Sequence, residues 1–142
     1  MPLYFFDTSA LVKRYHTEAG SETVDEIFND PEGTFFIANI TMTEFTSAFA
    51  RKLSEGIISE DDLIVCLSEF SKDIFNLFLI IDLDRNHINK SLPLIIKHNL
   101  RTLDSLQLAV FLSLAPLKPI MVTSDEILSN ATTNEGFQAL KP

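Results

Sequence analysis

The sequence contains a single cysteine, Cys66, so it can form neither a disulfide framework nor a cysteine-based zinc site. Its four glycines form no phosphate-binding loop, and no G-x-S-x-G motif is present. These absences argue against nucleotide kinases, Rossmann dehydrogenases and α/β-hydrolases. No apolar run approaches the roughly 20 residues of a membrane-spanning helix, and the first residues lack the basic region of a signal peptide. We therefore expect a cytoplasmic protein without membrane association.

Basic residues are also scarce, since 11 Lys and Arg residues stand against 20 Asp and Glu residues and give a formal net charge of −9. A chain of this charge is not expected to hold nucleic acid through a general basic surface. Nucleic acid remains possible as a substrate, because a bound divalent cation can supply positive charge locally. The length and the absence of repeats or linkers predict one domain over residues 1–142.

Short apolar runs of the kind found in strands buried on both faces recur along the chain. They are Leu3–Phe6, Thr34–Ala38, Leu77–Ile81, Ile120–Thr123 and Phe137–Leu140. Between them, segments such as 45–53 and 106–114 carry apolar residues at helical spacing. This order predicts an α/β fold with a parallel sheet. Pro93 lies inside a predicted helix over 85–99, where we expect a break near Ser91 or a kink.

Four carboxylates occupy junctions between these elements. Asp7 directly follows the first strand, and Asp125 follows the strand that ends at Thr123. Glu44 comes shortly after the second strand, and Asp104 lies in the first turn of an apolar helix. In a parallel sheet the strand C-termini and the following helix N-termini share one edge, where ligands bind. All four side chains are therefore expected to project into one crevice.

Each of these acids also has a purely structural interpretation. Thr41 and Glu44 match a capping box, in which the Glu side chain would only satisfy a backbone N–H. Asp104 and Asp125 are first-turn acids of the kind that the helix dipole favours, and Asp7 could cap a helix. Taken together, however, four acids at one edge repel one another unless they bind a cation or share protons.

Oxygen ligands without His or Cys select hard cations, here Mg²⁺ or Mn²⁺. His16, His87 and His98 are far apart and show no zinc-ligand spacing, so we expect surface or helix-end positions for them. Arg14 and Arg101 lie near candidate acids, where each could touch a substrate or pair with a carboxylate. The residues alone thus indicate a phosphodiesterase or phosphatase dependent on Mg²⁺ or Mn²⁺.

These segments, in this order and spacing, resemble the PIN-domain ribonucleases, and among them the VapC-type toxins of toxin–antitoxin pairs. No single motif is specific, but the ordered set extends over nearly the whole chain. The segments that carry the resemblance are Phe5–Tyr15, Glu18–Glu22, Thr43-Glu44, Leu100–Ala109, Val122–Asp125 and the tail Glu135–Pro142. Two departures are Glu126, where a basic residue is common, and Pro93 in the helix before Asp104.

The resemblance implies one PIN-like domain over residues 1–142, a three-layer sandwich with a central parallel sheet of about five strands flanked by helices. It implies Mg²⁺- or Mn²⁺-dependent endonucleolytic cleavage of RNA, often tRNA or rRNA, that leaves 3′-hydroxyl and 5′-phosphate ends. Asp7 and Asp104 would be the principal metal ligands and catalytic residues, completed by Glu44 and Asp125. Thr123 and Ser9 would hold a carboxylate or water. The implied partners are a cognate antitoxin and a second copy in a homodimer.

Two other functions remain open at this point. A catalytically silent PIN fold could bind RNA or a protein partner without cutting. An aspartyl-phosphate phosphatase could use Asp7 as its nucleophile, although the second aspartate usual two residues later is replaced by Ser9. Cleavage that needs metal, binding that persists with chelator, and phosphate release from a monoester would distinguish the three.

Overall fold

A computed structural model describes residues 1–142, and at its centre is a sheet of five parallel strands in the order β3-β2-β1-β4-β5. The predicted parallel α/β fold is therefore confirmed. Each predicted strand is present, and where the bounds differ they do so by one residue at one end. The strands are β1 (Leu3–Phe6), β2 (Thr34–Ala38), β3 (Phe78–Ile81), β4 (Ile120–Val122) and β5 (Gln138–Leu140).

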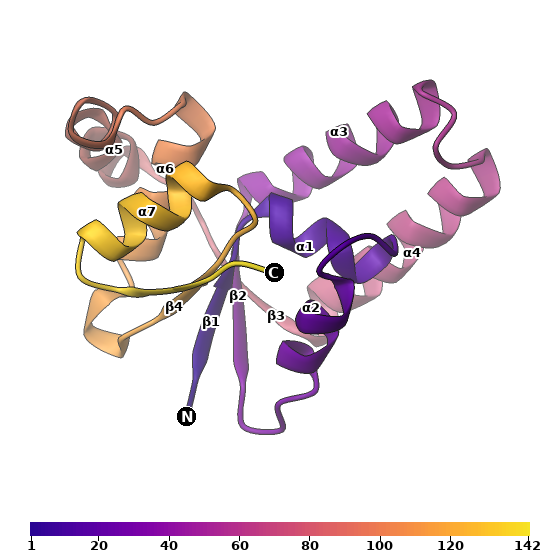
Figure 1. The fold of residues 1–142 in the computed structure, drawn as a ribbon, viewed down its shortest axis with the longest axis horizontal. Coiled ribbons are helices and arrows are strands. Elements are labelled where there is room, and N and C mark those ends of the chain that lie inside the picture. Colours follow the sequence, from indigo (N-terminus) through magenta and orange to yellow (C-terminus); the bar gives the residue numbers. More distant parts are fainter.

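Seven helices cover the two faces of this sheet and make the outer layers of the sandwich (Figure 1). Helices α1 to α4 lie on one side, and α5 to α7 lie on the other. None of the helices is both long enough and apolar enough to cross a lipid bilayer. Their bounds are α1 (Thr8–Tyr15), α2 (Ser21–Phe28), α3 (Ile40–Ser54), α4 (Glu60–Asn76), α5 (Arg85–His98), α6 (Thr102–Leu112) and α7 (Glu126–Asn134), with a short 3₁₀ turn at Ala115–Leu117.

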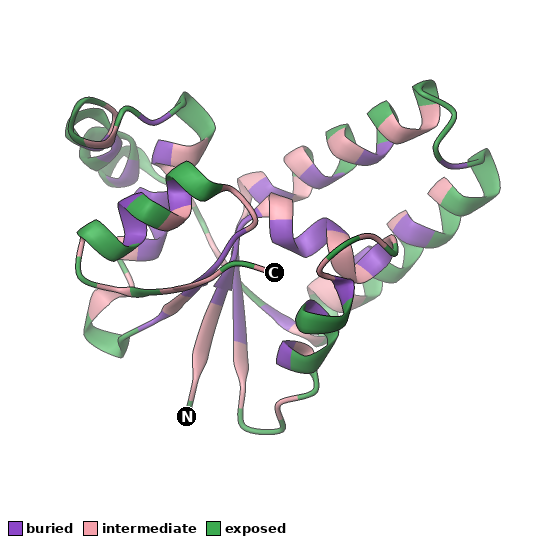
Figure 2. Ribbon diagram, viewed as in Figure 1, coloured by how far each residue is buried: buried purple, intermediate pink, exposed green.

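Two apolar cores form, one between each helical layer and the sheet. Strand residues alternate between them, so that Phe6 packs under α1 to α4 while Phe5 packs under α5 to α7. Figure 2 shows the same division, since buried residues line the sheet-facing sides of the helices and exposed residues lie outside. Aromatic stacking fills the first core, where the rings of Phe45 and Phe70 are 4.0 Å apart at their centroids. Burial of both faces explains why the central strands β1, β2 and β4 consist mostly of apolar residues.

Helix α5 runs without interruption through Pro93, so the break expected near Ser91 is wrong. A proline in a helix removes the backbone bond to the carbonyl four residues earlier, here that of Asn89. Both Asn89 and Pro93 are exposed, so water can take the place of the missing donor. Ser91 is buried on the opposite side and donates to the Ile88 carbonyl at 2.6 Å. The lost bond therefore costs too little to end the helix.

The order of the strands creates a switch point between β1 and β4. The chain moves outward from β1 to β3 on one side and then returns to build β4 and β5 on the other. Ligands of open α/β sheets bind beyond the strand C-termini at such a point. Asp7 directly follows β1 and Thr123 directly follows β4, so these two residues stand on either side of the switch point. The helices α3 and α4 extend away from the sheet on this side as a two-helix arm (Figure 1).

Candidate active site

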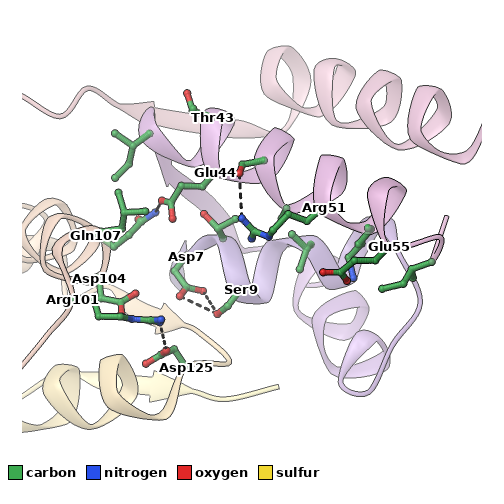
Figure 3. Close-up of a pocket in the computed structure, with 18 residues that line it drawn as sticks. Asp7, Ser9, Thr43, Glu44, Arg51, Glu55, Arg101, Asp104, Gln107 and Asp125 are labelled. Carbon is green, nitrogen blue, oxygen red and sulfur yellow. Dashed lines mark hydrogen bonds and ion pairs between the residues drawn. The ribbon is translucent and has the colours of Figure 1, made fainter. Parts of the chain in front are cut away.

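A groove of about 750 Å³ opens at the C-terminal edge of the sheet. The start of α1, one face of α3, the start of α6 and the turn into α7 form its walls. All four predicted carboxylates line it, namely Asp7, Glu44, Asp104 and Asp125. Figure 3 shows them gathered at one end of the groove, each contributed by a different helix start or strand end. The structure therefore brings together acids that lie far apart in the sequence, the first and last of them being Asp7 and Asp125.

Asp7 is the most buried of the four acids, with 4% of its surface exposed. As the N-cap of α1 it accepts a hydrogen bond from the Ala10 backbone N–H at 3.1 Å. Burial raises its pKa from the usual 3.8 to about 7, and the nearby charge of Asp104 adds to this, although hydrogen bonds to the carboxylate oppose the shift. The helix-capping interpretation of Asp7 is thus correct, and the same carboxylate also faces the groove.

Two hydroxyl groups fix the Asp7 carboxylate in place. Thr123 Oγ1 donates to Oδ2 at 2.7 Å, and Ser9 Oγ lies 2.8 and 2.9 Å from the two carboxylate oxygens. Thr123 is fully buried and also accepts from the Asp125 backbone N–H at 3.1 Å. Ser9 accepts from the Ser124 N–H at 3.0 Å. These contacts connect the end of β1 with the end of β4. The side-chain conformation of Asp7 is therefore fixed by hydrogen bonds that cross the switch point.

Glu44 is half-buried in the second turn of α3 and does not cap this helix. The capping box proposed for Thr41 and Glu44 is wrong, because the N-cap of α3 is Asn39, two residues before Thr41, and the helix begins at Ile40. Glu44 instead accepts from Gln107 Nε2 at 2.9 Å. Burial raises the pKa of Glu44, and the charge of Asp104 raises it further, while the Gln107 bond opposes both.

Gln107 was not singled out by the sequence analysis. It lies one turn after Asp104 on α6 and is 2% exposed. Its Nε2 donates to both Glu44 and Thr41, the latter at 2.8 Å, while its Oε1 is buried without a partner. A polar residue three positions after a candidate acid, within an otherwise apolar helix, is the signal that could have identified it.

Asp104 and Asp125 are joined by one cation. Arg101 Nε lies 3.3 Å from Asp104 Oδ2, and Arg101 Nη2 lies 3.3 Å from Asp125 Oδ2. Burial raises the pKa of Asp104 and the charge of Asp125 raises it further, whereas Arg101 opposes both. The Arg101 side chain is 80% exposed, so each of these ion pairs contributes about 0–1 kcal/mol and can be displaced at little cost. Arg14, by contrast, pairs with Asp73 of α4 at 3.2 Å and does not line the groove.

The donor set at this end of the groove is suited to a hard cation. It consists of carboxylate, hydroxyl and amide oxygens, with no His or Cys among the residues that line it. No three His, Cys, Asp or Glu side chains are close enough together to hold one ion among themselves. Mg²⁺ fits such a site, because it keeps several waters and usually takes only one or two protein carboxylates. The charge of Asp104 raises the pKa of Asp7, so a cation held between these two carboxylates would relieve that repulsion.

Comparison with known proteins agrees with this geometry. The sequence model of the PIN domain matches residues 4–132, whereas no curated protein sequence matches the chain. Among solved structures, the chain is similar to Mycobacterium tuberculosis VapC20, described as a sarcin-ricin loop cleaving toxin, with a TM-score of 0.70 and 11% identity over 98% of this chain and 99% of that one.

Two further structures have the same fold. FitAcB from Neisseria gonorrhoeae matches with a TM-score of 0.65 and 14% identity, over 98% of this chain and 97% of that one. DNA-bound VapBC from Salmonella typhimurium matches with a TM-score of 0.60 and 14% identity, over 99% and 98%. Because the family match extends over most of the chain, and the sheet and helices agree with it, this protein belongs to the PIN domain family.

Proposed function

We propose that this protein is an endoribonuclease that hydrolyses RNA phosphodiester bonds with the help of Mg²⁺ or Mn²⁺. One observation carries the proposal: four carboxylates from four separate elements line one end of a single groove. The charge of Asp104 raises the pKa of Asp7 and of Glu44, and the charge of Asp125 raises that of Asp104. Ionising several carboxylates this close together costs free energy unless a positive charge balances them. A cation and a phosphodiester together account for it, because the cation neutralises the acids and attracts the phosphate.

We assign Asp7 and Asp104 as the principal metal ligands, with Glu44 and Asp125 completing the acidic pocket by binding a second ion, directly or through water. When bound, the ion would lower the pKa of a water molecule and stabilise negative charge on the phosphate oxygens. Ser9 and Thr123 hold the Asp7 carboxylate in one orientation through the hydrogen bonds described above.

In the proposed reaction, the oxygen of a water molecule forms a bond to phosphorus, and the bond from phosphorus to the 3′ oxygen breaks. The products are a 3′-hydroxyl and a 5′-phosphate. Glu44 accepts a proton from the attacking water, since Gln107 holds its carboxylate toward the groove and burial raises its pKa. The departing 3′ oxygen takes its proton from solvent.

We further propose that the protein acts in the cytoplasm as the toxin of a toxin–antitoxin pair, with a cognate antitoxin and a second copy as its protein partners. The structural similarity to VapBC and FitAcB supports this. The net charge of −9 suits an antitoxin with a basic segment. A row of exposed apolar side chains on α5, formed by Ile88, Leu92 and Ile96, is typical of a surface that contacts protein.

The test is cleavage of total cellular RNA, including tRNA and rRNA, by purified, antitoxin-free protein with Mg²⁺ or Mn²⁺ against EDTA. We expect discrete fragments that require metal and that decrease by at least about 100-fold in Asp7→Asn and Asp104→Asn. Asp25→Asn, a change in an exposed carboxylate of α2, is the matched control and should leave cleavage intact.

Three results would contradict the proposal in different ways. Unchanged cleavage in Asp7→Asn and Asp104→Asn would remove these residues from the site. Binding of RNA or a protein partner that persists in EDTA, without cleavage at any metal concentration, would identify a silent binding module. Release of phosphate from a generic monoester, lost in Asp7→Asn, would instead indicate a phosphatase.

A further inference from the structure

The groove continues well beyond the carboxylates, along the face of α3 that leads toward the tip of the two-helix arm. Thr43, Ser47 and Arg51 are spaced four residues apart and all line it, so they form one polar row along the wall. The opposite wall is the start of α1, which contributes Ser9 and Val12. An RNA strand that is cut at the carboxylate end has this groove as a path for its neighbouring nucleotides.

The charges of the groove change along this path. The carboxylate end is acidic, and the middle is neutral, with Ser47, Ala48 and Val12 as lining residues. The far end contains Arg51 and Lys52 together with Glu55, and Lys52 is paired with Glu18, so the positive charge offered there is that of Arg51. A polyanion bound over the acidic end through a cation would therefore next meet a neutral stretch and then positive charge, which matches the requirement of a phosphate backbone.

Arg51 is the one cation of the groove without a carboxylate partner. Arg101 is paired with two acids, and Lys52 Nζ lies 3.4 Å from Glu18 Oε2. Arg51 Nη1 instead donates to Ser47 Oγ at 3.2 Å, a contact one turn back along α3. Glu55, one turn further along, also lines the groove and makes no ion pair with Arg51. The guanidinium thus keeps most of its five donors available for a ligand.

The Arg51 side chain is directed toward the carboxylate end of the groove, which favours a role in ligand binding. A basic residue in the last turn of a helix is favoured by the helix dipole alone. Figure 3 shows, however, that Arg51 lies back along α3 toward Glu44 and the other carboxylates, as helical side chains lean toward the N-terminus. The guanidinium therefore lies beside Ser47, and from Glu44 to Ser47 the helix advances about 5 Å. That length corresponds to about one to two nucleotides of a stacked strand.

We infer that Arg51, oriented by Ser47, is a phosphate-binding subsite that holds the RNA backbone about one to two nucleotides from the bond that is cut. This inference rests on the proposed ribonuclease function and adds to it a preference for a single strand long enough to reach from the carboxylates to Arg51. A planar guanidinium is suited to this position because it can bind a phosphate through two parallel hydrogen bonds.

Binding is measured first, with a fluorescein-labelled oligouridine of about 12 nucleotides, which is long enough to fill the groove. Fluorescence anisotropy follows binding to the non-cleaving Asp104→Asn protein in Mg²⁺ over a series of salt concentrations. Adding Arg51→Gln should weaken binding about tenfold and reduce the slope of log affinity against log salt by about 0.7, the value for one phosphate contact on a single strand. Arg51→Lys should retain part of the affinity. Lys90→Gln, an exposed cation on α5, is the matched control and should change neither quantity.

Cleavage then separates this role from a structural one. In the otherwise wild-type protein, Arg51→Gln should raise KM for a long RNA with little change in kcat, and should leave cleavage of a dinucleotide unchanged. An unaltered salt slope, or equal losses on long and short substrates, would overturn the subsite while the ribonuclease function stands. If the wild-type protein neither binds nor cuts RNA, both proposals fail together.

Discussion

Replacing Asp7 by Asn is expected to stabilise this protein at neutral pH while it removes the proposed activity. The folded protein holds the Asp7 proton up to about pH 7, whereas the unfolded chain releases it near pH 3.8. Between these values the folded state binds more protons than the unfolded state, so the free energy of unfolding falls as pH rises. A shift of about three pKa units corresponds to about 4 kcal/mol. The group is 4% exposed, so solvent screening does not reduce this value much.

Asn has nearly the same shape as Asp but cannot ionise, so the variant does not lose the stability that the wild-type protein loses when buried Asp7 ionises. Its side-chain oxygen can still accept from the Ala10 N–H, and its amide can donate to the hydroxyl of Thr123 or Ser9. We therefore expect Asp7→Asn to match the wild-type protein in stability near pH 4. Above pH 7 it should exceed the wild type by up to about 4 kcal/mol.

Urea unfolding in EDTA, followed by circular dichroism at several pH values between about 4 and 8, measures this difference. Asp25→Asn is the control, since its carboxylate is exposed on α2 and its replacement should leave the pH dependence unchanged. A wild-type protein at least as stable as Asp7→Asn at pH 8 would refute the reasoning. Added Mg²⁺ should reduce the advantage of the variant, because it stabilises the ionised form of Asp7 only in the wild type.

Three further predictions concern the core, a helix start and the site. Phe45→Ala should lower the free energy of unfolding by about 3–5 kcal/mol in urea titrations, because the ring is fully buried against Phe70; a loss below about 1 kcal/mol would contradict the packing. Ser59→Ala should cost about 1 kcal/mol in the same assay, since it removes the capping box that begins α4; no change in stability would argue against that cap. Arg101→Gln removes a cation that competes at Asp104, so calorimetric titration should show Mg²⁺ binding tightened by about fivefold. Weaker Mg²⁺ binding in this variant would show that Arg101 supports the metal site instead.

Local patterns in the sequence were sufficient for much of the fold. The apolar runs predicted all five strands, because a strand buried on both faces needs side chains such as those of Leu3–Phe6 at every position. Placing Asp7, Glu44, Asp104 and Asp125 at one edge required only the parallel order of the strands, which sets strand C-termini and helix N-termini on the same side.

Other features depended on contacts that no local pattern contains. Whether Pro93 ends α5 is decided by which side of the helix faces solvent, and the sheet determines that side. Thr41 accepts a hydrogen bond from Gln107, 66 residues away, because the first turns of α3 meet α6 at the groove. The bond from Thr123 to Asp7 spans 116 residues and exists only because β1 and β4 pair.

The sequence by itself therefore predicted four candidate carboxylates and determined the edge at which they meet, since periodicity and strand order are local properties of the chain. The tertiary structure decided how those residues act on one another. Burial raised the pKa of Asp7, Arg101 came to join Asp104 and Asp125, and Arg51 came to line the far end of the same groove. Desolvation and charge–charge distance depend on how distant segments pack, and packing forms only when the whole chain folds.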